Sequence, residues 1–528
     1  MNDQIDYLKV RAALGRITRR EFIGRMGALG VSAAVANVML TNAVRAAGPQ
    51  KGGTIRVGIQ GGGSGDSLDP AMAANATMTQ IVRLWGEPLV ELAASGEGLD
   101  PKVAESFTST PDAVTWTFKI RSGMTFHNGQ PVTAEDVRAT IERHSGEDTK
   151  SGALGLLRDI KSLSVDGDNF IVELNQPNAD LPYLMADYHL IIQPNGGNDD
   201  PTAAIGTGPY ALKDAEPGVR FVFERFDDHW NGDGNADTVE LLVINDDTAR
   251  VAALQSGQVD MINRVPPRTA GLIDRAPGVK VHNKSGPGHY VFIMHCNTAP
   301  FDNNDLRLAL KYGINREEMV DKILFGYGSV GNDTPINESY PLHTAFEQRE
   351  YDPDKAAFHL KKSGHDGSVL LRTSDNSFPG APDAAALFQQ TLSQAGIPLE
   401  IKREPNDGYW SEVWNAQPFC TSYWGGRPTQ DQMFTTAYLS TADWNDTRFQ
   451  NEQFDQLLIA ARAELDQEKR TQMYADMGAL VRDEGGLICP MFNDFIDAIS
   501  DRVAGYEEGG VGYELMNFYA PVQMWVAA

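Results

Sequence analysis

Residues 103–144 read VAESFTSTPDAVTWTFKIRSGMTFHNGQPVTAEDVRATIERH, and they contain signals for both a strand and a helix. Within this stretch, VTWTFKI (114–120) alternates large apolar or β-branched residues with polar ones, which predicts a strand. The end of the stretch, TAEDVRATIERH, predicts a helix that Thr133 caps and whose first turn carries Glu135 and Asp136. A strand and a capped helix in one short stretch indicate a mixed α/β chain.

An apparent export signal precedes this region. Two adjacent arginines, Arg19 and Arg20, stand before an apolar stretch rich in glycine and alanine. The pattern resembles the bacterial twin-arginine signal, whose cargo crosses the membrane already folded. Small or short residues that end at Ala46 have the spacing that a signal peptidase reads, so we expect a signal peptide of residues 1–46. An uncleaved anchor is disfavoured because GALGVSAA (27–34) is weakly apolar for a span of about 20 residues.

The pattern seen in the first stretch continues through the mature chain. Further strands are predicted at 51–59, 170–174, 220–226, 239–244 and 290–296. Further helices are predicted at 304–325, where Asn315 caps the second of two, and at 352–364 and 466–486. No internal repeat of solenoid length occurs. A mature chain of about 480 residues exceeds one hydrophobic core, so we expect a mixed α/β protein with two lobes.

The net charge limits the partners of the protein. The whole chain has a charge of −26, and the signal peptide holds seven basic and three acidic residues, which leaves −30 for the mature chain. So negative a charge repels nucleic acid and anionic lipid. No later stretch is long and apolar enough to span a bilayer, so we expect a free periplasmic monomer that binds no nucleic acid.

The cysteines give little indication of function. Cys296, Cys420 and Cys489 are too few for a disulfide framework. Because folding before export takes place in a reducing cytoplasm, we expect all three to be buried as small hydrophobic residues. The sequence leaves open whether Cys420 and Cys489 come close enough to pair.

Motifs for catalysis, nucleotides and metals are incomplete. GGGSGD (61–66) lacks the Gly-Lys-Ser/Thr of a phosphate loop, and SDN (374–376) has no Ser-x-x-Lys to accompany it. His289, His295 and Cys296 lie on one predicted strand. His289 and His295 are six residues apart, which is about 20 Å on a strand, so the three side chains cannot share one metal ion. We therefore expect no enzyme activity, no metal centre and no cofactor. A secreted hydrolase with an unrecognised dyad has no motif in its support.

Aromatic residues are dense between 409 and 444. The set comprises Tyr409, Trp410, Trp414, Phe419, Tyr423, Trp424, Phe434, Tyr438 and Trp444. GGRPTQ (425–430) interrupts it, and its glycine pair would let a ligand approach the backbone. Arg427 could then orient an anionic group by bidentate hydrogen bonds. The same residues are equally compatible with a core of aromatic rings in which Arg427 is solvated or pairs with Asp431.

Six stretches together resemble the peptide- and nickel-binding family of extracellular solute-binding proteins, which deliver ligands to ATP-driven importers. They follow the order of the family over almost the whole mature chain. They are GGTIRVGI…SLDPA near the mature start, 103–144, IGTGPYAL (205–212), TARVAALQSGQVDMI (248–262), 296–328 and YDPDKAAFHLKKSG (351–364). The stretch 103–144 is specific to the family, with Trp116, Phe118, Arg121, Phe126 and Gly129 among the residues in place.

The resemblance implies a two-lobed periplasmic binding protein that closes over its ligand like a hinged clamp. By analogy, lobe one covers residues 47–295 plus 490–528 and contains an extra inserted subdomain near 90–200. Lobe two covers 296–489. The partner of the closed form would be the membrane permease of an ABC importer.

The resemblance also implies a ligand site in the aromatic region. In dipeptide-binding relatives, an aspartate after the tryptophan holds the amino terminus of the peptide, and here Arg427 occupies that place. This favours a short peptide or related amino-acid-derived solute that presents a carboxylate, although Asp431 could instead supply an acidic contact. The predicted ligand contacts are Arg427, Trp424, Tyr423, Gly425, Tyr409, Trp410, Trp444 and Asn445, with Trp85 and Tyr290 from the opposing lobe. The alternative function is uptake of nickel or of a metal chelate.

Overall fold

The structure is a computed structural model that describes residues 2–13, 17–32, 35–36, 39, 48–73, 75–93, 98–146, 148–374, 377–405, 409–442, 444–507 and 512–527. The predicted cleavage point after Ala46 lies outside these residues. Before it, helices α1 (Asn2–Ala13) and α2 (Arg19–Ala28) form, and Thr18 caps α2 in a reciprocal capping box with Glu21. Within the described part of the chain, no helix has the length and apolar character needed to cross a membrane.

The chain divides into two compact units. The first comprises Met1–Gln176, Leu181–Asn283 and Ile496–Ala528, and the second comprises Pro177–Asp180 and Lys284–Phe495. We predicted the changes of lobe at 295/296 and 489/490, and both positions differ from those observed. The reason is that β13 (His289–Met294) and β18 (Leu487–Asn493) pair with each other in the sheet of the second unit. The strand predicted at 290–296 therefore belongs to the second unit.

The first unit contains a seven-stranded mixed sheet with β1 (Thr54–Ile59) at its centre. β1 runs parallel to both of its neighbours, and its alternating residues Ile55, Val57 and Ile59 are fully buried. The order is β12 (Val279–Lys284), β19 (Phe495–Ser500), β11 (Met261–Ile262), β1, β10 (Thr238–Val243), β9 (Arg220–Arg225) and β8 (Tyr210–Glu216). Helices α4 (Ala76–Trp85) and α8 (Asp247–Gln255) contact strands of this sheet. The unit also contains α9 (Pro267–Ile273) and, near the C-terminus, β20 (Val503–Ala504), α17 (Glu514–Asn517), α18 (Ala520–Gln523) and β21 (Trp525–Val526).

A separate antiparallel sheet lies within the first unit and includes strands from residues 103–144. Its order is β4 (Ala104–Ser109), β5 (Thr115–Ile120), β7 (Asn169–Leu174) and β6 (Ile160–Asp166). Helix α5 (Ala134–Ser145) begins after Thr133, which forms a capping box with Asp136, and this confirms the predicted helix start. Trp116 and Phe118 enter a core of its own that draws on residues between Leu89 and Ile192. These residues fall in the range near 90–200 for which we predicted an inserted subdomain.

Short elements complete this part of the chain. They are η1 (Pro70–Met72), β2 (Val90–Leu92), β3 (Leu99–Pro101), α6 (Leu154–Leu157), α7 (Leu181–Leu184) and η2 (Pro194–Gly197).

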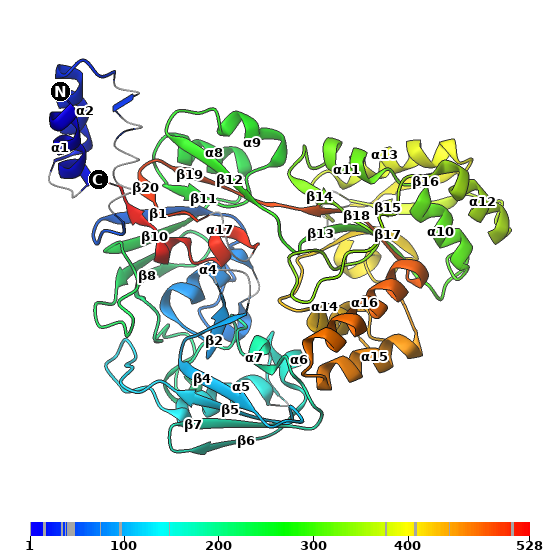
Figure 1. Ribbon diagram of the computed structural model, residues 1–528, viewed down its shortest axis with the longest axis horizontal. Helices are drawn as coiled ribbons and strands as arrows, with labels where there is room; N and C mark the ends of the chain where they lie inside the picture. The colour runs from blue at the N-terminus through cyan, green and yellow to red at the C-terminus, as the bar shows by residue number, and fades with distance from the viewer. Residues whose placement is uncertain are drawn as a thin grey trace. The chain divides into compact units, whose positions relative to one another are not determined.

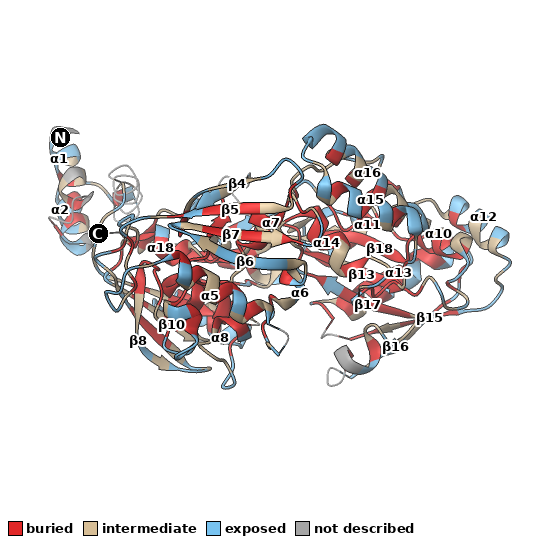
Figure 2. Cartoon of the chain, turned by 90° about the horizontal axis from the view of Figure 1, so that it is seen from below, coloured by how far each residue is buried: buried red, intermediate tan, exposed pale blue. Residues whose placement is uncertain are grey.

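The second unit is built on a six-stranded sheet. Its order is β14 (Gly328–Val330), β18, β13, β17 (Phe419–Trp424), β15 (Val369–Thr373) and β16 (Leu399–Arg403). Helices α10 (Asn304–Tyr312), α11 (Arg316–Lys322), α12 (Pro353–Ser363) and α13 (Ala381–Gln394) cover one face, and α14 (Gln430–Ala437), α15 (Glu452–Ala463) and α16 (Gln467–Glu484) cover the other (Figure 1). Strand alternation explains the two cores, since Phe292 and Met294 enter the first whereas Val291 and Ile293 enter the second. Figure 2 shows β13, β17 and β18 almost wholly buried.

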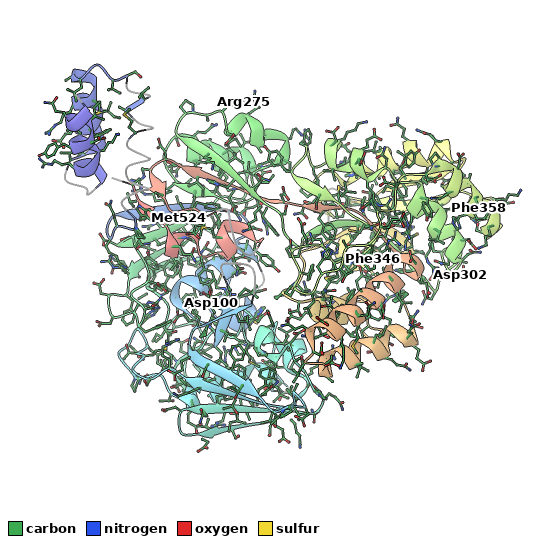
Figure 3. All side chains as sticks on the ribbon, viewed as in Figure 1. Asp100, Arg275, Asp302, Phe346, Phe358 and Met524 are labelled. Atoms are coloured by element: carbon green, nitrogen blue, oxygen red, sulfur yellow. The ribbon has the colours of Figure 1, made fainter. Side chains whose placement is uncertain are left out.

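The predicted helix ends of the second unit are confirmed. Asn315 caps α11, Asp352 caps α12 and Asp466 caps α16, each with a side-chain oxygen that accepts from the backbone of the first turn. Helix α12 ends at Gly364, whose left-handed φ of 72° glycine adopts without strain. The outer surface of α12 exposes Phe358 (Figure 3).

Candidate ligand-binding site

The end of β17 positions the central residues of the aromatic region. Tyr423 and Trp424 are its last two residues, so their side chains point to opposite faces of the sheet. Tyr423 lies opposite Tyr290 of β13 and is 49% exposed, whereas Trp424 lies opposite His289 and is 5% exposed. β17 thus buries one ring and leaves its neighbour in contact with solvent, just before the glycine-rich loop.

Three tryptophans from separate segments pack against one another, and we call them the tryptophan cluster. The ring centroids of Trp414, Trp424 and Trp444 are separated by 6.0–6.3 Å in edge-to-face or tilted geometry. Such arrangements are favoured because the positive edge of one ring meets the negative face of another. Trp444 is 50% exposed, so the cluster reaches the surface of the second unit through this ring.

Asp446 accepts hydrogen bonds from two members of the cluster. The indole N–H groups of Trp414 and Trp424 both donate to Asp446 Oδ2, at 3.0 and 3.2 Å. The carboxylate is fully buried. Burial raises the pKa of Asp446 to about 7, and the two indole hydrogen bonds oppose that rise.

Arg427 contacts the cluster through the Trp424 ring. Its guanidinium carbon is 5.6 Å from the centroid of the Trp424 ring, a distance typical of a cation–π contact. Arg427 Nη1 donates to Gly426 O at 2.7 Å, and its backbone N–H donates to the Tyr340 hydroxyl at 3.1 Å. Among the described residues no carboxylate forms an ion pair with Arg427. The guanidinium is held in place but keeps hydrogen-bond donors for an anionic group.

The two glycines before Arg427 differ in what surrounds them. Gly426 has a φ of +79°, and a Cβ atom there would lie 2.4 Å from Pro287 Cβ. Only glycine satisfies both conditions without a shift of the loop. A Cβ at Gly425 would meet no atom within 4 Å. Space is therefore open beside residue 425, next to Trp424.

One histidine of the described residues, His144, is hydrogen-bonded to a serine. No group of three or more metal-binding side chains occurs in that part of the chain. His144 accepts from Arg143 Nη2 at Nε2, because a guanidinium only donates, so Nδ1 carries the proton and donates to Ser151 Oγ at 2.6 Å. An imidazole that donates to a serine cannot take the proton of that serine. This Ser–His pair is therefore not arranged as a nucleophile and its base.

The decisive comparison is with protein families. The model of the family described as "Bacterial extracellular solute-binding proteins, family 5 Middle" matches residues 98–446. The chain belongs to this family. The match confirms the resemblance to the family and spans five of the six sequence stretches, all except the one near the mature start. The general role of the chain is therefore that of a bacterial extracellular solute-binding protein.

Individual relatives agree with this assignment. The glutathione-binding protein GsiB of Salmonella typhi is 26% identical over 428 residues, which are 76% of this chain and 82% of the relative. The periplasmic binding protein DppA of Helicobacter pylori, solved with the peptide STSA, has a TM-score of 0.76 at 20% identity, and the alignment covers 91% of this chain and 99% of the DppA chain. PBP AgaA from A. tumefacien R10, solved with agropinic acid, has a TM-score of 0.75 at 23% identity, and the alignment covers 90% of this chain and 99% of the AgaA chain. The likeness confirms the mixed α/β, two-lobed fold of a periplasmic binding protein.

Two predicted contacts of this family 5 protein prove to be internal. Tyr409 is 1% exposed, and its hydroxyl donates to Thr421 O at 2.7 Å. The Asn445 amide donates to Phe449 O at 2.6 Å and accepts from Phe449 N at 3.0 Å. The polar groups of both side chains form hydrogen bonds inside the second unit, so their prediction as ligand contacts is wrong in this structure.

The two residues predicted from the opposing lobe also need correction. Trp85 is fully buried in the core of the first unit, where it packs among apolar residues such as Ile81 and Tyr210. It is therefore a core residue. Tyr290 belongs to β13 of the second unit, and its ring stacks on Phe378 at a centroid distance of 4.4 Å. The side chain of Trp410 lies outside the described residues.

Asp431 does not offer a free acidic contact. Its side chain is buried, and Arg462 Nε donates to its Oδ1 at 2.8 Å. Burial raises the pKa of Asp431, and the Arg462 charge counteracts this. The pairing removes Asp431 as a ligand anchor and also as the partner of Arg427.

The three cysteines differ in burial. The thiols of Cys296, Cys420 and Cys489 are free. Cys420 and Cys489 are buried as predicted, whereas Cys296 is only partly buried, so the prediction that all three are buried is wrong for Cys296.

Asp446 and Tyr340 are parts of the site that were not predicted from the sequence. Asp446 directly follows the predicted contact Asn445, and its only local signal is a carboxylate two residues after Trp444. Tyr340 lies 87 residues before Arg427 and offered no signal, since a hydroxyl that accepts one backbone N–H has no sequence pattern.

Proposed function

We propose that this family 5 protein captures a small amino-acid-derived solute with a carboxylate, such as a short peptide or a conjugate, and delivers it to a permease. The observation that carries the proposal is the Arg427 guanidinium, which lies on Trp424 and has no carboxylate partner among the described residues. Arginine presents a planar fork of donors that matches a carboxylate in bidentate geometry.

The surroundings of Arg427 fit such a solute. Trp444 is about half exposed and would provide flat contact area at the surface of the tryptophan cluster, of which Trp424 is the member in contact with Arg427. A Cβ atom at Gly425, the residue after Trp424, would meet no atom within 4 Å, which leaves open space there. The names of two relatives support the same class of ligand, because glutathione and agropinic acid are both amino-acid-derived acids.

The site of action follows from the proposed export signal. Arg19 and Arg20 would direct the folded protein through the twin-arginine pathway, and cleavage after Ala46 would release it as a periplasmic monomer. Western analysis of periplasmic fractions, with the two arginines replaced by lysine as the contrast, tests this route. Retention of the wild-type protein in the cytoplasm would contradict it.

Calorimetric titration tests the proposed ligand class. The probes are glutathione, agropinic acid, the peptide STSA and STSA with its carboxyl terminus amidated. We expect at least one carboxylate probe to bind, and we expect Arg427→Ala to weaken it by about a hundredfold, since loss of a desolvated charge pair costs a few kcal/mol. Arg275→Ala is the matched control, because Arg275 is an exposed arginine of the first unit (Figure 3). Equal affinity of Arg427→Ala and wild type would refute the role of the anchor.

A further inference from the structure

The two oxygens of the buried Asp446 carboxylate have different surroundings. Both indole donors converge on one oxygen, Oδ2, at 3.0 Å from Trp414 and 3.2 Å from Trp424. The other oxygen, Oδ1, is buried and has no hydrogen-bond partner among the described residues. A buried carboxylate without an arginine or lysine ion pair is costly, so a role in ordering its two partners would explain why it is there.

The groups that face Asp446 come from several elements. Cys420 faces it from β17, Tyr438 from the residue that ends α14, and Arg448 from the following loop. The buried hydroxyl of Tyr438 has no partner among the described residues. Cys420 and Tyr438 stay neutral near pH 7, because burial raises the pKa of each. Asp446 is therefore the group of this set that changes charge near neutral pH.

A short chain of contacts leads from Asp446 to Arg427. Asp446 Oδ2 accepts from the edge of the Trp424 ring, and the face of that ring lies under the Arg427 guanidinium at 5.6 Å. An indole has two side-chain torsions, and a hydrogen bond at Nε1 fixes the orientation of its plane. A cation–π contact depends on that orientation, since the attraction acts at the face of the ring.

We propose that Asp446 is a positioning residue for the solute anchor, because its Oδ2 fixes the Trp424 ring and, through that ring, the place of the Arg427 guanidinium. The part that concerns the solute rests on the proposed function, whereas the orientation of the two indoles does not. The ionised form accepts the indole N–H groups more strongly than the neutral form, so the hold on Trp424 tightens as Asp446 ionises.

Indole N–H signals test the positioning without any ligand. In protein labelled with ¹⁵N-tryptophan, Trp414→Phe and Trp424→Phe identify the two signals by their loss. We expect both signals to move together in a pH titration with one midpoint near 7, as burial places the pKa of Asp446 at about 7. Asp446→Asn keeps an acceptor oxygen but cannot ionise, so it abolishes the movement.

The matched control is Asp497→Asn. Asp497 is a buried carboxylate of the first unit whose pKa burial also raises to about 7, so its replacement should leave both indole titrations unchanged. If the two signals titrate in Asp446→Asn as in wild type, or if only one of them responds to pH in wild type, the proposal is overturned.

Two further readouts follow the effect to Arg427. Phenylglyoxal modifies arginine side chains, and peptide mass spectrometry reports its rate at Arg427, which we expect to rise severalfold in Asp446→Ala and to rise less in Asp446→Asn. An unchanged rate in Asp446→Ala would overturn the link through Trp424. The affinity for glutathione should fall about tenfold in Asp446→Ala. If wild-type protein binds no glutathione, that result counts against glutathione as the solute, whereas the indole and phenylglyoxal results still decide the role of Asp446.

Discussion

Arg427 and Asp431 lie four residues apart, one in the loop before α14 and the other in its first turn, yet they have opposite surroundings. Asp431 is buried and paired with Arg462, so its charge is satisfied inside the second unit. Arg427 lies at the surface of the tryptophan cluster and has no described carboxylate within ion-pair distance. The difference shows that a charged residue near a binding motif marks a ligand contact only when the protein leaves that charge unsatisfied.

The largest expected effect separates the two residues by stability. Asp431→Ala would remove the carboxylate that accepts from Arg462 Nε and so break this partly buried ion pair, which should lower the free energy of unfolding by about 3 kcal/mol. Arg427→Ala should change it by less than about 1 kcal/mol, because the side chain is partly exposed and loses one cation–π contact and one hydrogen bond but no ion pair to a described carboxylate. Urea denaturation of both variants gives the values. Equal destabilisation by the two substitutions would remove the distinction between a structural charge and an anchor.

A third charged residue sharpens the comparison through its pH dependence. Asp446 is buried like Asp431 but faces neutral indoles, and burial raises its pKa to about 7 from an unfolded value of about 3.9. The folded protein therefore binds more protons than the unfolded chain between these values. The stability that Asp446 contributes is fully present below about pH 4 and is lost as the pH rises through about 7.

Asp446→Asn should remove that dependence. Relative to wild type, its free energy of unfolding should rise by about 2 kcal/mol between pH 5 and pH 8. Buried histidines such as His144 and His289, whose pKa values burial lowers to about 3 and about 4, oppose this trend in both proteins. They cancel in the difference. Urea unfolding at the two pH values measures it, and a difference independent of pH would mean that Asp446 does not titrate in this range.

A comparison within the loop concerns the two glycines beside Arg427. Gly426→Ala meets both a positive φ and a clash with Pro287, so we expect a loss of about 1–3 kcal/mol in stability. Gly425→Ala meets open space and should leave the melting temperature almost unchanged. The same Gly425→Ala protein should bind carboxylate probes more weakly if the solute approaches there. Equal melting temperatures for the two variants would contradict the geometry of the loop.

The helix starts and most of the strands were predictable because their causes are local. Thr133, Asn315 and Asp352 cap helices through backbone groups only two or three residues away, so the sequence carries that information directly. The unit boundary was not predictable in this way. It depends on the pairing of β13 with β18, whose residues lie almost two hundred positions apart.

The site was predictable as a region but not ring by ring. Aromatic density pointed to residues 409–444, whereas burial divides them, with Tyr409 in the core and Tyr423 at the surface. That division follows from which face of β17 the helices α14–α16 cover. Asp446 was missed because its donors, Trp414 and Trp424, lie 32 and 22 residues earlier in the chain.

The measurement that tests the central claim most directly is native mass spectrometry of the protein purified from its own periplasm, followed by denaturation and identification of the released compound. We predict an amino-acid-derived compound with a carboxylate, retained by wild type and by Arg275→Ala but lost from Arg427→Ala. A metal complex, a compound without a carboxylate, or equal retention by Arg427→Ala would contradict the proposed anchor.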